Sequence, residues 1–370
     1  MNNLRLMKGS FWTAAGITAA TLIGLAAVAG ASTFLYQRPA GRFPAQLVAV
    51  MRSREVLDNP GVTGYYERLF AKQGRMDKIY IFDHSFRIFR FKPNLTWERD
   101  GVTTNGYGLI GPECSLQKPP STRRLALLGS SITSGHMVHA NQTYGALLEK
   151  RLNEVQPNGP SQRFEILNFA VVSYTLPQIL DVAVEDVPRF DPDGYLIDVN
   201  ELSVALEWSR HLVQITQLGI DPKYDFLRAI LRQAGVSKED DSAIIRAKLA
   251  PYRIPVLRGV LQELKANAAR HHASLILLLV PAVEPADMSR RRIQTIREVL
   301  DSLDVPVVDL LDSYDGILNR APLAAYAGDV HPNARGHALL GENLYRKLRA
   351  QPDAWAALVG SETAKQGAHK

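Results

Sequence analysis

The chain has 370 residues, of which 46% are hydrophobic and 22% are charged, and this ordinary globular composition provides enough apolar residues for a sizeable core. Its formal net charge is +6, and outside Arg5 and Lys8 near the N-terminus 41 basic residues face 37 acidic ones. An excess this small and dispersed argues against a nucleic-acid-binding protein. The single cysteine, Cys114, excludes an intrachain disulfide.

A stretch without charge spans residues 11–36 and follows a short basic leader, residues 1–10. About 20 apolar residues suffice to cross the hydrocarbon core of a bilayer, so this stretch is long enough to do so. Ala29-Gly-Ala31 also fits the cleavage site of a secretory signal peptide, but the apolar run exceeds the roughly 7 to 15 residues of a signal-peptide core. We therefore expect an uncleaved single-pass membrane anchor, with the leader in the cytoplasm and the main domain in the periplasm or outside the cell.

Residues 37–104 are expected to form a linker and a small β-rich extension. The first part mixes proline, arginine and short apolar clusters, and one short helix is predicted near residues 43–54. Between residues 78 and 99, aromatic and β-branched residues predominate. This composition predicts short strands that pack against the main body of the protein.

The main domain, expected at residues 105–350, alternates apolar stretches with helical patterns. Buried strands are predicted at 125–128, 163–170, 194–200, 274–280 and 305–310. Helices are predicted at 142–153, 175–187, 256–270, 288–303 and 333–348. Strands that alternate with helices indicate an α/β fold with a parallel sheet of about five strands. The polar tail, residues 351–370, is expected to be flexible.

A long connection separates the third predicted strand from the fourth. It has about 70 residues, more than one crossover needs, and contains helical patterns at 224–233 and 242–249. We therefore predict a helical insertion at about residues 203–252. The sequence leaves open whether it is a lid over the ligand-binding edge of the sheet or a packed helical addition.

Hydroxyl, amide and imidazole side chains follow the predicted strands. Carboxyl-end loops of parallel strands converge on one edge of an open sheet, where ligands bind. The segments expected at that edge are Gly129-Ser-Ser-Ile-Thr133, residues 168–174, Asn200-Glu-Leu202 and Gly328-Asp-Val-His-Pro332. A Gly-Ser-Ser sequence alone is usually a plain turn or a helix cap. Together, however, these segments contain the nucleophile, base and hydrogen-bond donors that acyl transfer by a serine requires.

In this order the four segments resemble the blocks of the SGNH (GDSL-like) hydrolase family, over residues 105–348. The Gly-Asp-Ser block of the family is similar to residues 129–131, which implies Ser131 and not Ser130 as the nucleophile. The Asp-x-x-His-Pro block implies His331 as the base, and Asn200 resembles the family's asparagine. The second-block glycine falls at Ser173, so the resemblance implies an oxyanion hole formed by Asn200 and Ser173. It further implies a three-layer α/β/α fold with a flavodoxin-like sheet, and no cofactor.

Three positions depart from the family's pattern. Ser130 replaces the aspartate that supports the nucleophile turn, and Ser173 keeps the backbone amide of the usual glycine but adds a side chain. The usual position of the triad acid, three residues before the histidine, is occupied by Gly328. Asp329, two residues before His331, is therefore the candidate acid, and we expect it to contribute less than His331 because the offset redirects its carboxylate.

Other polar residues near these blocks are interpreted as structural. His136 and His139 flank the serine loop, but no acidic or cysteine neighbour in sequence accompanies them, so we expect no metal site. Asp198 and Glu201, on either side of Asn200, are expected to stabilise the fold.

The pattern as a whole favours a serine esterase that removes an O-acetyl or other short acyl group from a carbohydrate or similar exported substrate. Such a substrate is a small-molecule or polysaccharide acyl ester, and the membrane is contacted through the N-terminal helix. One alternative is an O-acyltransferase that acts on a cell-envelope or exopolysaccharide sugar through the same acyl-enzyme. Another is a non-catalytic binding or assembly protein with the SGNH fold. The sequence indicates no particular protein partner.

Overall fold

The computed structural model describes residues 76–97, 101–157 and 162–360. The expected leader, the membrane anchor and the short helix near 43–54 lie outside these ranges, as does the end of the chain from residue 361. Within the described ranges, no helix combines the length and the apolar character that crossing a membrane requires.

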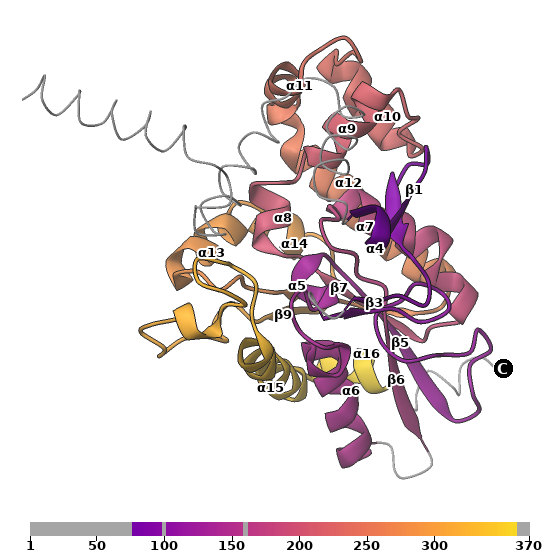
Figure 1. Ribbon diagram of the computed structural model, residues 1–370, viewed down its shortest axis with the longest axis vertical. Coiled ribbons are helices and arrows are strands. Elements are labelled where there is room, and N and C mark those ends of the chain that lie inside the picture. The colour runs from indigo at the N-terminus through magenta and orange to yellow at the C-terminus, as the bar shows by residue number, and fades with distance from the viewer. Residues whose placement is uncertain (1–75, 98–100, 158–161, 361–370) are drawn as a thin grey trace, which may run out of the picture. The chain divides into compact units, whose positions relative to one another are not determined.

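A sheet of five parallel strands lies at the centre of the described residues (Figure 1). In chain order the strands are β5 (Thr122–Leu128), β6 (Arg163–Asn168), β7 (Gly194–Asp198), β8 (Ser274–Leu279) and β9 (Val307–Asp309). Their spatial order, β6-β5-β7-β8-β9, is that of a flavodoxin-like sheet, whose direction of winding reverses between the first and third strands. The predicted flavodoxin-like parallel sheet of about five strands is therefore confirmed.

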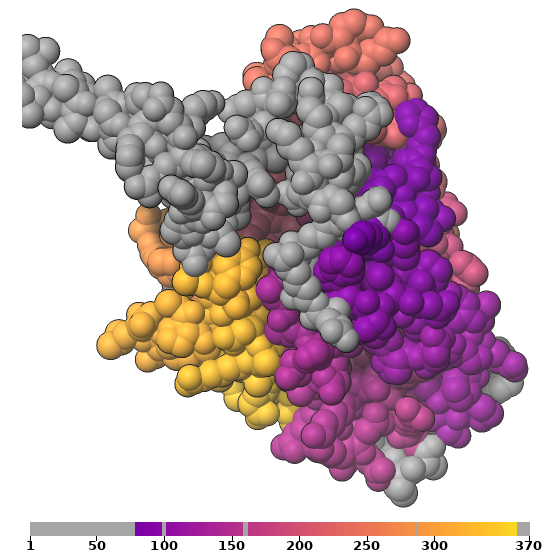
Figure 2. All heavy atoms as spheres, viewed as in Figure 1, coloured from indigo at the N-terminus to yellow at the C-terminus, as the bar shows by residue number. Residues whose placement is uncertain are grey.

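Helices cover both faces of the sheet and complete three layers. Successive strand residues point to opposite faces, so Leu127 and Leu128 belong to different clusters of buried apolar residues. On the Leu127 side the sheet packs against α6 (Tyr144–Val155), α15 (Ala334–Ala350) and α16 (Pro352–Val359). Helices α6 and α15 lie side by side, and their atoms adjoin in the space-filling view (Figure 2).

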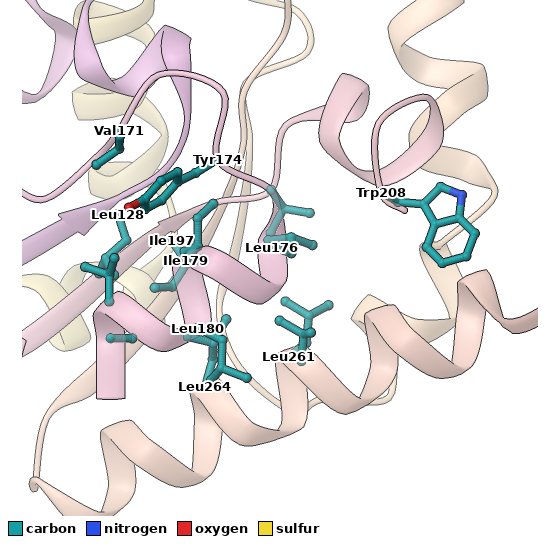
Figure 3. Packing of buried hydrophobic residues seen from close by; sticks show 14 of the residues in the cluster. Leu128, Val171, Tyr174, Leu176, Ile179, Leu180, Ile197, Trp208, Leu261 and Leu264 are labelled. Atoms are coloured by element: carbon teal, nitrogen blue, oxygen red, sulfur yellow. The ribbon is translucent and has the colours of Figure 1, made fainter. Parts of the chain in front are cut away.

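On the Leu128 side the sheet packs against α7 (Leu176–Glu185), α12 (Arg253–Arg270) and α14 (Arg297–Asp301). Figure 3 shows Leu128 and Ile197 of the sheet facing Ile179 and Leu180 of α7, with Leu261 and Leu264 of α12 beyond them. The remaining helices of the main domain are α5 (Ser131–Ser134), α13 (Ala286–Gln294) and the short turns η3 (Ala140–Gln142), η4 (Val187–Phe190) and η6 (Ala321–Leu323).

The β-rich extension packs against the main body, as predicted. It contains α4 (Met76–Ile79), the hairpin β1 (Tyr80–Phe82) with β2 (Phe89–Phe91), and the pair β3 (Thr96–Trp97) with β4 (Val102–Thr103). Tyr80, Phe89 and Phe91 are buried in the same apolar cluster as Leu128. The aromatic residues therefore serve as core.

The insertion is a packed helical addition. It comprises α8 (Glu201–Ala205), α9 (Arg210–Leu218), α10 (Asp225–Ala234), α11 (Ser242–Leu249) and η5 (Ala250–Tyr252). Leu212, Leu227 and Leu249 are fully buried and join the cluster that covers the sheet. Of the two alternatives left open by the sequence, the buried apolar residues favour the packed addition over a lid.

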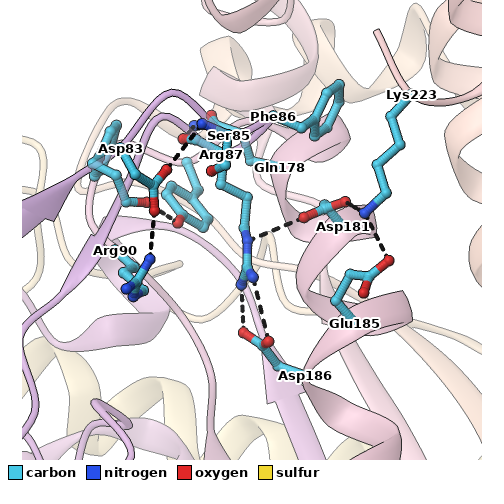
Figure 4. Close-up of polar contacts among 12 residues, drawn as sticks. Asp83, Ser85, Phe86, Arg87, Arg90, Gln178, Asp181, Glu185, Asp186 and Lys223 are labelled. Carbon is cyan, nitrogen blue, oxygen red and sulfur yellow. Dashed lines mark hydrogen bonds and ion pairs between the residues drawn. The ribbon is translucent and has the colours of Figure 1, made fainter. Parts of the chain in front are cut away.

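Ion pairs on α7 connect the hairpin with the insertion (Figure 4). Arg87, in the loop of the hairpin, pairs with Asp181 at 3.0 Å and also with Asp186. Lys223, at the start of the α10 segment, pairs with Asp181 at 2.5 Å and with Glu185 at 2.7 Å. Because both basic side chains share Asp181, the hairpin and the insertion are fixed to the same stretch of α7.

Two sequence expectations are wrong. The predicted helix at 288–303 is divided into α13 and α14, because the backbone leaves helical geometry at Ile296 (φ −123°). Part of the expected flexible tail is α16, whose Ala354 and Leu358 are fully buried. The guanidinium of Arg123 donates to the carbonyl of Ala357 at 2.7 Å, so this helix is fixed to β5.

Candidate active site

The nucleophile turn begins where β5 ends. A side chain at Gly129 would place its Cβ 2.3 Å from Oγ1 of Thr133 and 2.8 Å from Cβ of Asp198, so only glycine fits. Ser131 then opens the short helix α5, which Gly135 ends in the left-handed conformation (φ 73°). The carbonyl of Ser131 accepts hydrogen bonds from the backbone amides of Gly135 and His136 and from the side chain of Ser134. The backbone carbonyl of the nucleophile is therefore held by the residues that follow it.

A continuous hydrogen-bonded chain joins three of the predicted residues. Oγ of Ser131 lies 2.8 Å from Nε2 of His331, although 200 positions separate the two residues. Nδ1 of His331 lies 2.8 Å from Oδ1 of Asp329. A proton on Nδ1 shared with the carboxylate leaves the lone pair of Nε2 directed at the serine hydroxyl. This is the arrangement in which an imidazole acts as a base toward a serine.

The carboxyl of Asp329 is ionised although it is partly buried. Burial of the carboxyl opposes ionisation, but the hydrogen bond from His331 and the backbone amide of Val330 (2.8 Å) favour it, and the net pKa lies below its usual value. The second oxygen, Oδ2, is buried and has no hydrogen-bond partner among the described residues. The two-residue spacing thus aims the carboxylate at the imidazole and not elsewhere.

The loop that carries His331 is tightly fixed. The carbonyl of His331 accepts a hydrogen bond from the amide of Ala325 at 2.8 Å. Asn333 caps α15 through its side-chain oxygen, and its side-chain amide donates to the carbonyl of Pro322 at 2.9 Å. A Cβ at Gly336 would lie 2.6 Å from Cβ of Pro332, so the glycine at this position has a steric reason.

The two histidines that follow the nucleophile, His136 and His139, have different surroundings in the structure. The ring of His136 packs edge-on against the ring of His331, with centroids 4.8 Å apart. His139 is exposed, and its backbone amide donates to the side chain of Gln142 at 3.2 Å. No group of three or more potential metal-ligating side chains is found among the described residues. Sequence reasoning did not anticipate the contact between His136 and His331.

A buried carboxyl lies beneath the nucleophile turn. Asp198, at the end of β7, accepts a hydrogen bond from Oγ1 of Thr133 at 2.6 Å, and Thr133 in turn lies 2.9 Å from the hydroxyl of Tyr144. Burial raises the pKa of Asp198 to about 7, although Thr133 and the amide of Ser130 act in the opposite direction. The family aspartate is missing at position 130, and here a carboxyl from the neighbouring strand contacts the same turn.

The predicted oxyanion donors lie on the loops that follow β6 and β7, on either side of β5. Asn200 is buried, and its side chain accepts from the amide of Leu202 at 2.9 Å and donates to the carbonyl of Val280 at 3.1 Å. Ser173 lies in a turn in which the amide of Tyr174 bonds the carbonyl of Val171, and its φ is +69°. Among the hydrogen bonds of the described residues, none joins Asn200 or Ser173 to Ser131 or His331.

Comparison with known proteins agrees with this site. A model of the GDSL-like lipase/acylhydrolase family matches residues 127–339, which include all five predicted site residues. No curated protein sequence matches the chain.

Several solved structures are similar to it. The structure of TesA is 17% identical over 62% of this chain and 99% of that chain, with a TM-score of 0.40. An acetylxylan esterase from Geobacillus stearothermophilus is 16% identical over 61% of this chain and 94% of that one, with a TM-score of 0.40. A two-domain esterase active on acetylated mannans is 14% identical over 62% and 49% of the two chains, with a TM-score of 0.41.

Proposed function

Because the chain belongs to the GDSL-like lipase/acylhydrolase family and is therefore an ester hydrolase of the SGNH type, we propose that it removes an O-acetyl or other short acyl group from a carbohydrate or similar exported substrate. The reaction proceeds through an acyl-enzyme on Ser131. The observation that carries this proposal is the chain of two 2.8 Å contacts from Ser131 through His331 to Asp329. An assembled triad of this kind also argues against the alternative of a non-catalytic protein.

In the acylation step, Oγ of Ser131 attacks the carbonyl carbon of the ester while Nε2 of His331 takes the hydroxyl proton. The resulting tetrahedral intermediate carries a negative charge on the former carbonyl oxygen. When it collapses, the bond to the alkoxy oxygen breaks, and His331 gives its proton to the departing sugar hydroxyl. Asp329 stabilises the imidazolium throughout, because its lowered pKa keeps it ionised at neutral pH.

In the deacylation step, water replaces the sugar. His331 takes a proton from the water, whose oxygen attacks the acyl carbon, and then returns the proton to Oγ of Ser131 as the carboxylic acid leaves. In an acyltransferase the hydroxyl of a second sugar would take the place of this water. The triad serves both reactions equally. The product formed in the presence of acceptor sugars distinguishes them, because hydrolysis releases a carboxylic acid whereas transfer gives an acylated sugar.

We assign the oxyanion hole to the backbone amide of Ser173 and the side-chain amide of Asn200. A positive φ at Ser173 supports this assignment, because a glycine-like conformation is what the family position requires. The side chain of Asn200 has two N–H groups, and one of them is used by Val280. Ser131 and His331 are both half-buried, so an ester on a bulky alcohol reaches the nucleophile from the protein surface.

A fluorophosphonate probe tests the nucleophile, because it phosphonylates activated serines. We expect the purified protein to be labelled and to hydrolyse a chromogenic acetyl ester. Ser131→Ala should abolish labelling and lower turnover on the order of a million-fold, as loss of the nucleophile does in serine enzymes. Ser130→Ala is the matched control and should still be labelled. Labelling that is lost in Ser130→Ala but kept in Ser131→Ala would contradict the assignment.

We further propose that residues 11–36 anchor the protein in a membrane, with the catalytic domain outside the cytoplasm. The proposal rests on the length and lack of charge of that segment. Mass spectrometry of the mature protein isolated from membranes should then find the N-terminal segment intact. A mature N-terminus at Ser32, directly after Ala29-Gly-Ala31, would instead identify a cleaved signal peptide.

A further inference from the structure

The turn formed by residues 171–174 has a conformation that its sequence disfavours. The carbonyl of Val171 accepts the amide of Tyr174 at 3.1 Å, and the third residue of the turn, Ser173, has a φ of +69°. Turns with a positive φ at the third position favour glycine, because an L side chain is strained there. Ser173 is nevertheless held in this conformation, so contacts elsewhere must compensate for the strain.

Arg210 supplies one of these contacts. It is the first residue of α9, in the helical insertion, and its guanidinium donates a hydrogen bond to the backbone carbonyl of Ser173. The other arm of the guanidinium pairs with the carboxylate of Glu207 at 2.7 Å, and the side chain is only 20% exposed. Arg210 is therefore itself fixed in position, and it holds the carbonyl of the strained residue.

The neighbouring residues of the turn are anchored to two other parts of the protein. Tyr174 is fully buried, and its hydroxyl donates to the carbonyl of Phe89 in the β1–β2 hairpin. At the other end, the amide of Val171 bonds the carbonyl of Gly129 at 3.3 Å, two residues before the nucleophile. The Ser173 amide lies in the peptide between Val172 and Ser173, and the φ torsion of Ser173 sets its direction relative to the peptide that follows. The bond from Arg210 holds the carbonyl of that following peptide and so restrains one side of the rotation.

We propose that Arg210 is a positioning residue for the oxyanion hole. It restrains Ser173 in the left-handed conformation, so that the amide of this residue faces the developing negative charge on the substrate. In the family, glycine at this position adopts the left-handed conformation by its own preference. In this chain a side chain from the insertion holds the backbone in that conformation. The inference rests on the proposed function, because it takes Ser131 as the nucleophile and Ser173 as an oxyanion donor.

The test is a double-mutant cycle of Arg210→Ala and Ser173→Gly, with kcat and KM measured on a chromogenic acetyl ester and the rate of fluorophosphonate labelling as a second readout. Arg210→Ala should lower kcat by roughly tenfold and leave KM within about twofold, because the oxyanion hole acts in the transition state; loss of a whole donor typically costs a hundred- to a thousandfold. In the Ser173→Gly background the same change should cost less than about threefold, since glycine adopts the turn unaided. Arg210→Lys, which keeps the charge but not the planar fork, should fall between wild type and Arg210→Ala.

Arg228→Ala is the matched control. Arg228 lies on the same insertion, and within the part of the chain that the structure describes its guanidinium pairs with the acidic surface neighbours Asp221 and Asp225, so its removal should leave kcat unchanged. Thermal unfolding of each variant separates loss of fold from loss of catalysis. Equal losses of kcat in the serine and glycine backgrounds would overturn the proposal, and so would a rise in KM with unchanged kcat, which would make Arg210 a substrate-binding residue. Failure of the proposed function would give a different result, because Ser131→Ala would then be as active as the wild-type protein.

Discussion

The loop that carries His331 is held mainly by its neighbours in sequence, whereas the turn that carries Ser173 is held by residues far away along the chain. The amide of Ala325 and the cap at Asn333 fix the histidine loop, together with two distant contacts, from Val283 to Val330 and between Ser131 and His331. The turn at Ser173 depends instead on the hairpin and on the insertion, through the contacts to Phe89 and Arg210.

The comparison distinguishes two ways of holding a residue of the site in place. The geometry of a locally supported loop depends on its own residues, here Pro332, Asn333 and Gly336. A turn supported from outside tolerates a change of its own residue, because distant side chains restrain the backbone. Ser173 in place of glycine is such a change. Substitutions can remove the local and the distant support of the site residues separately.

Apart from the loss of the nucleophile or of the base, the largest effect is expected at Asp329, which supports His331 locally. Asp329→Asn keeps the size of the side chain but loses the charge, and the amide favours the wrong tautomer of the imidazole. We expect turnover to fall roughly ten-thousand-fold, yet to remain measurable, because the serine, the histidine and the oxyanion donors persist.

The turnover of His331→Ala, measured in parallel, is the reference with which the turnover of Asp329→Asn is compared. Removal of the base should cost on the order of a million-fold, about as much as removal of the nucleophile. If Asp329→Asn proved as inactive as His331→Ala, Asp329 would be as indispensable as the base, and the expectation that it contributes less than His331 would be wrong. If it retained more than a tenth of the wild-type activity, the charge of Asp329 would contribute less than tenfold to turnover despite the 2.8 Å contact with His331.

A smaller loss is expected at Asn200, which makes one local and one distant contact. Asn200→Asp retains an oxygen for the amide of Leu202, two residues away, but loses the donor to Val280 and the proposed donor to the oxyanion. Turnover should fall by roughly a hundred- to a thousandfold with little change in KM. Helix α8 should remain, since its cap is preserved, and circular dichroism with thermal unfolding checks this. A variant with unchanged kcat would exclude Asn200 from the oxyanion hole.

The sequence was sufficient for the parts of the molecule that depend on local pattern. All five strands lie within three residues of their predicted ends, because unbroken apolar runs bounded by turns identify buried parallel strands. Ser131 and His331 were identified by their blocks, and the structure brings their side chains together. The contact between Asp329 and His331 could not be predicted, because a shift of one residue in a loop changes the direction of a side chain by an amount that spacing does not reveal.

Other features depend on contacts that no local pattern marks. Arg210 is one of several arginines on amphipathic helices, and only the folded chain shows that its guanidinium reaches Ser173. Helix α16 was missed because its alanine-rich segment resembles a tail, whereas Ala354 and Leu358, four residues apart, form the buried face of a short helix. Asp198 ends a buried apolar strand, and its place beneath the nucleophile turn follows from the pairing of β5 with β7.

The support that β7 gives to the nucleophile turn leads to a prediction about stability. The pKa of Asp198 is about 7 in the folded protein, because the carboxyl is buried, and its ordinary value is 3.8. Between pH 4 and pH 7 the folded state therefore holds a proton that the unfolded state has lost, so the free energy of unfolding falls as the pH rises through this range. Above pH 7 the carboxyl is ionised in both states, and its contribution no longer changes.

Asp198→Asn tests this directly, since the amide resembles the protonated carboxyl and retains an acceptor for Thr133. Urea unfolding at a series of pH values should find the two proteins similar near pH 4 and the variant more stable at pH 8, by about 1.4 kcal/mol for each unit by which the folded pKa exceeds the unfolded one. Glu201, a second buried acid close to Asp198, is present in both proteins, so the difference between them reports Asp198 together with its repulsion from Glu201. A difference in stability that stayed constant from pH 4 to pH 8 would mean that Asp198 is already ionised in the folded protein, and that the turn rests on a charged and not a neutral carboxyl.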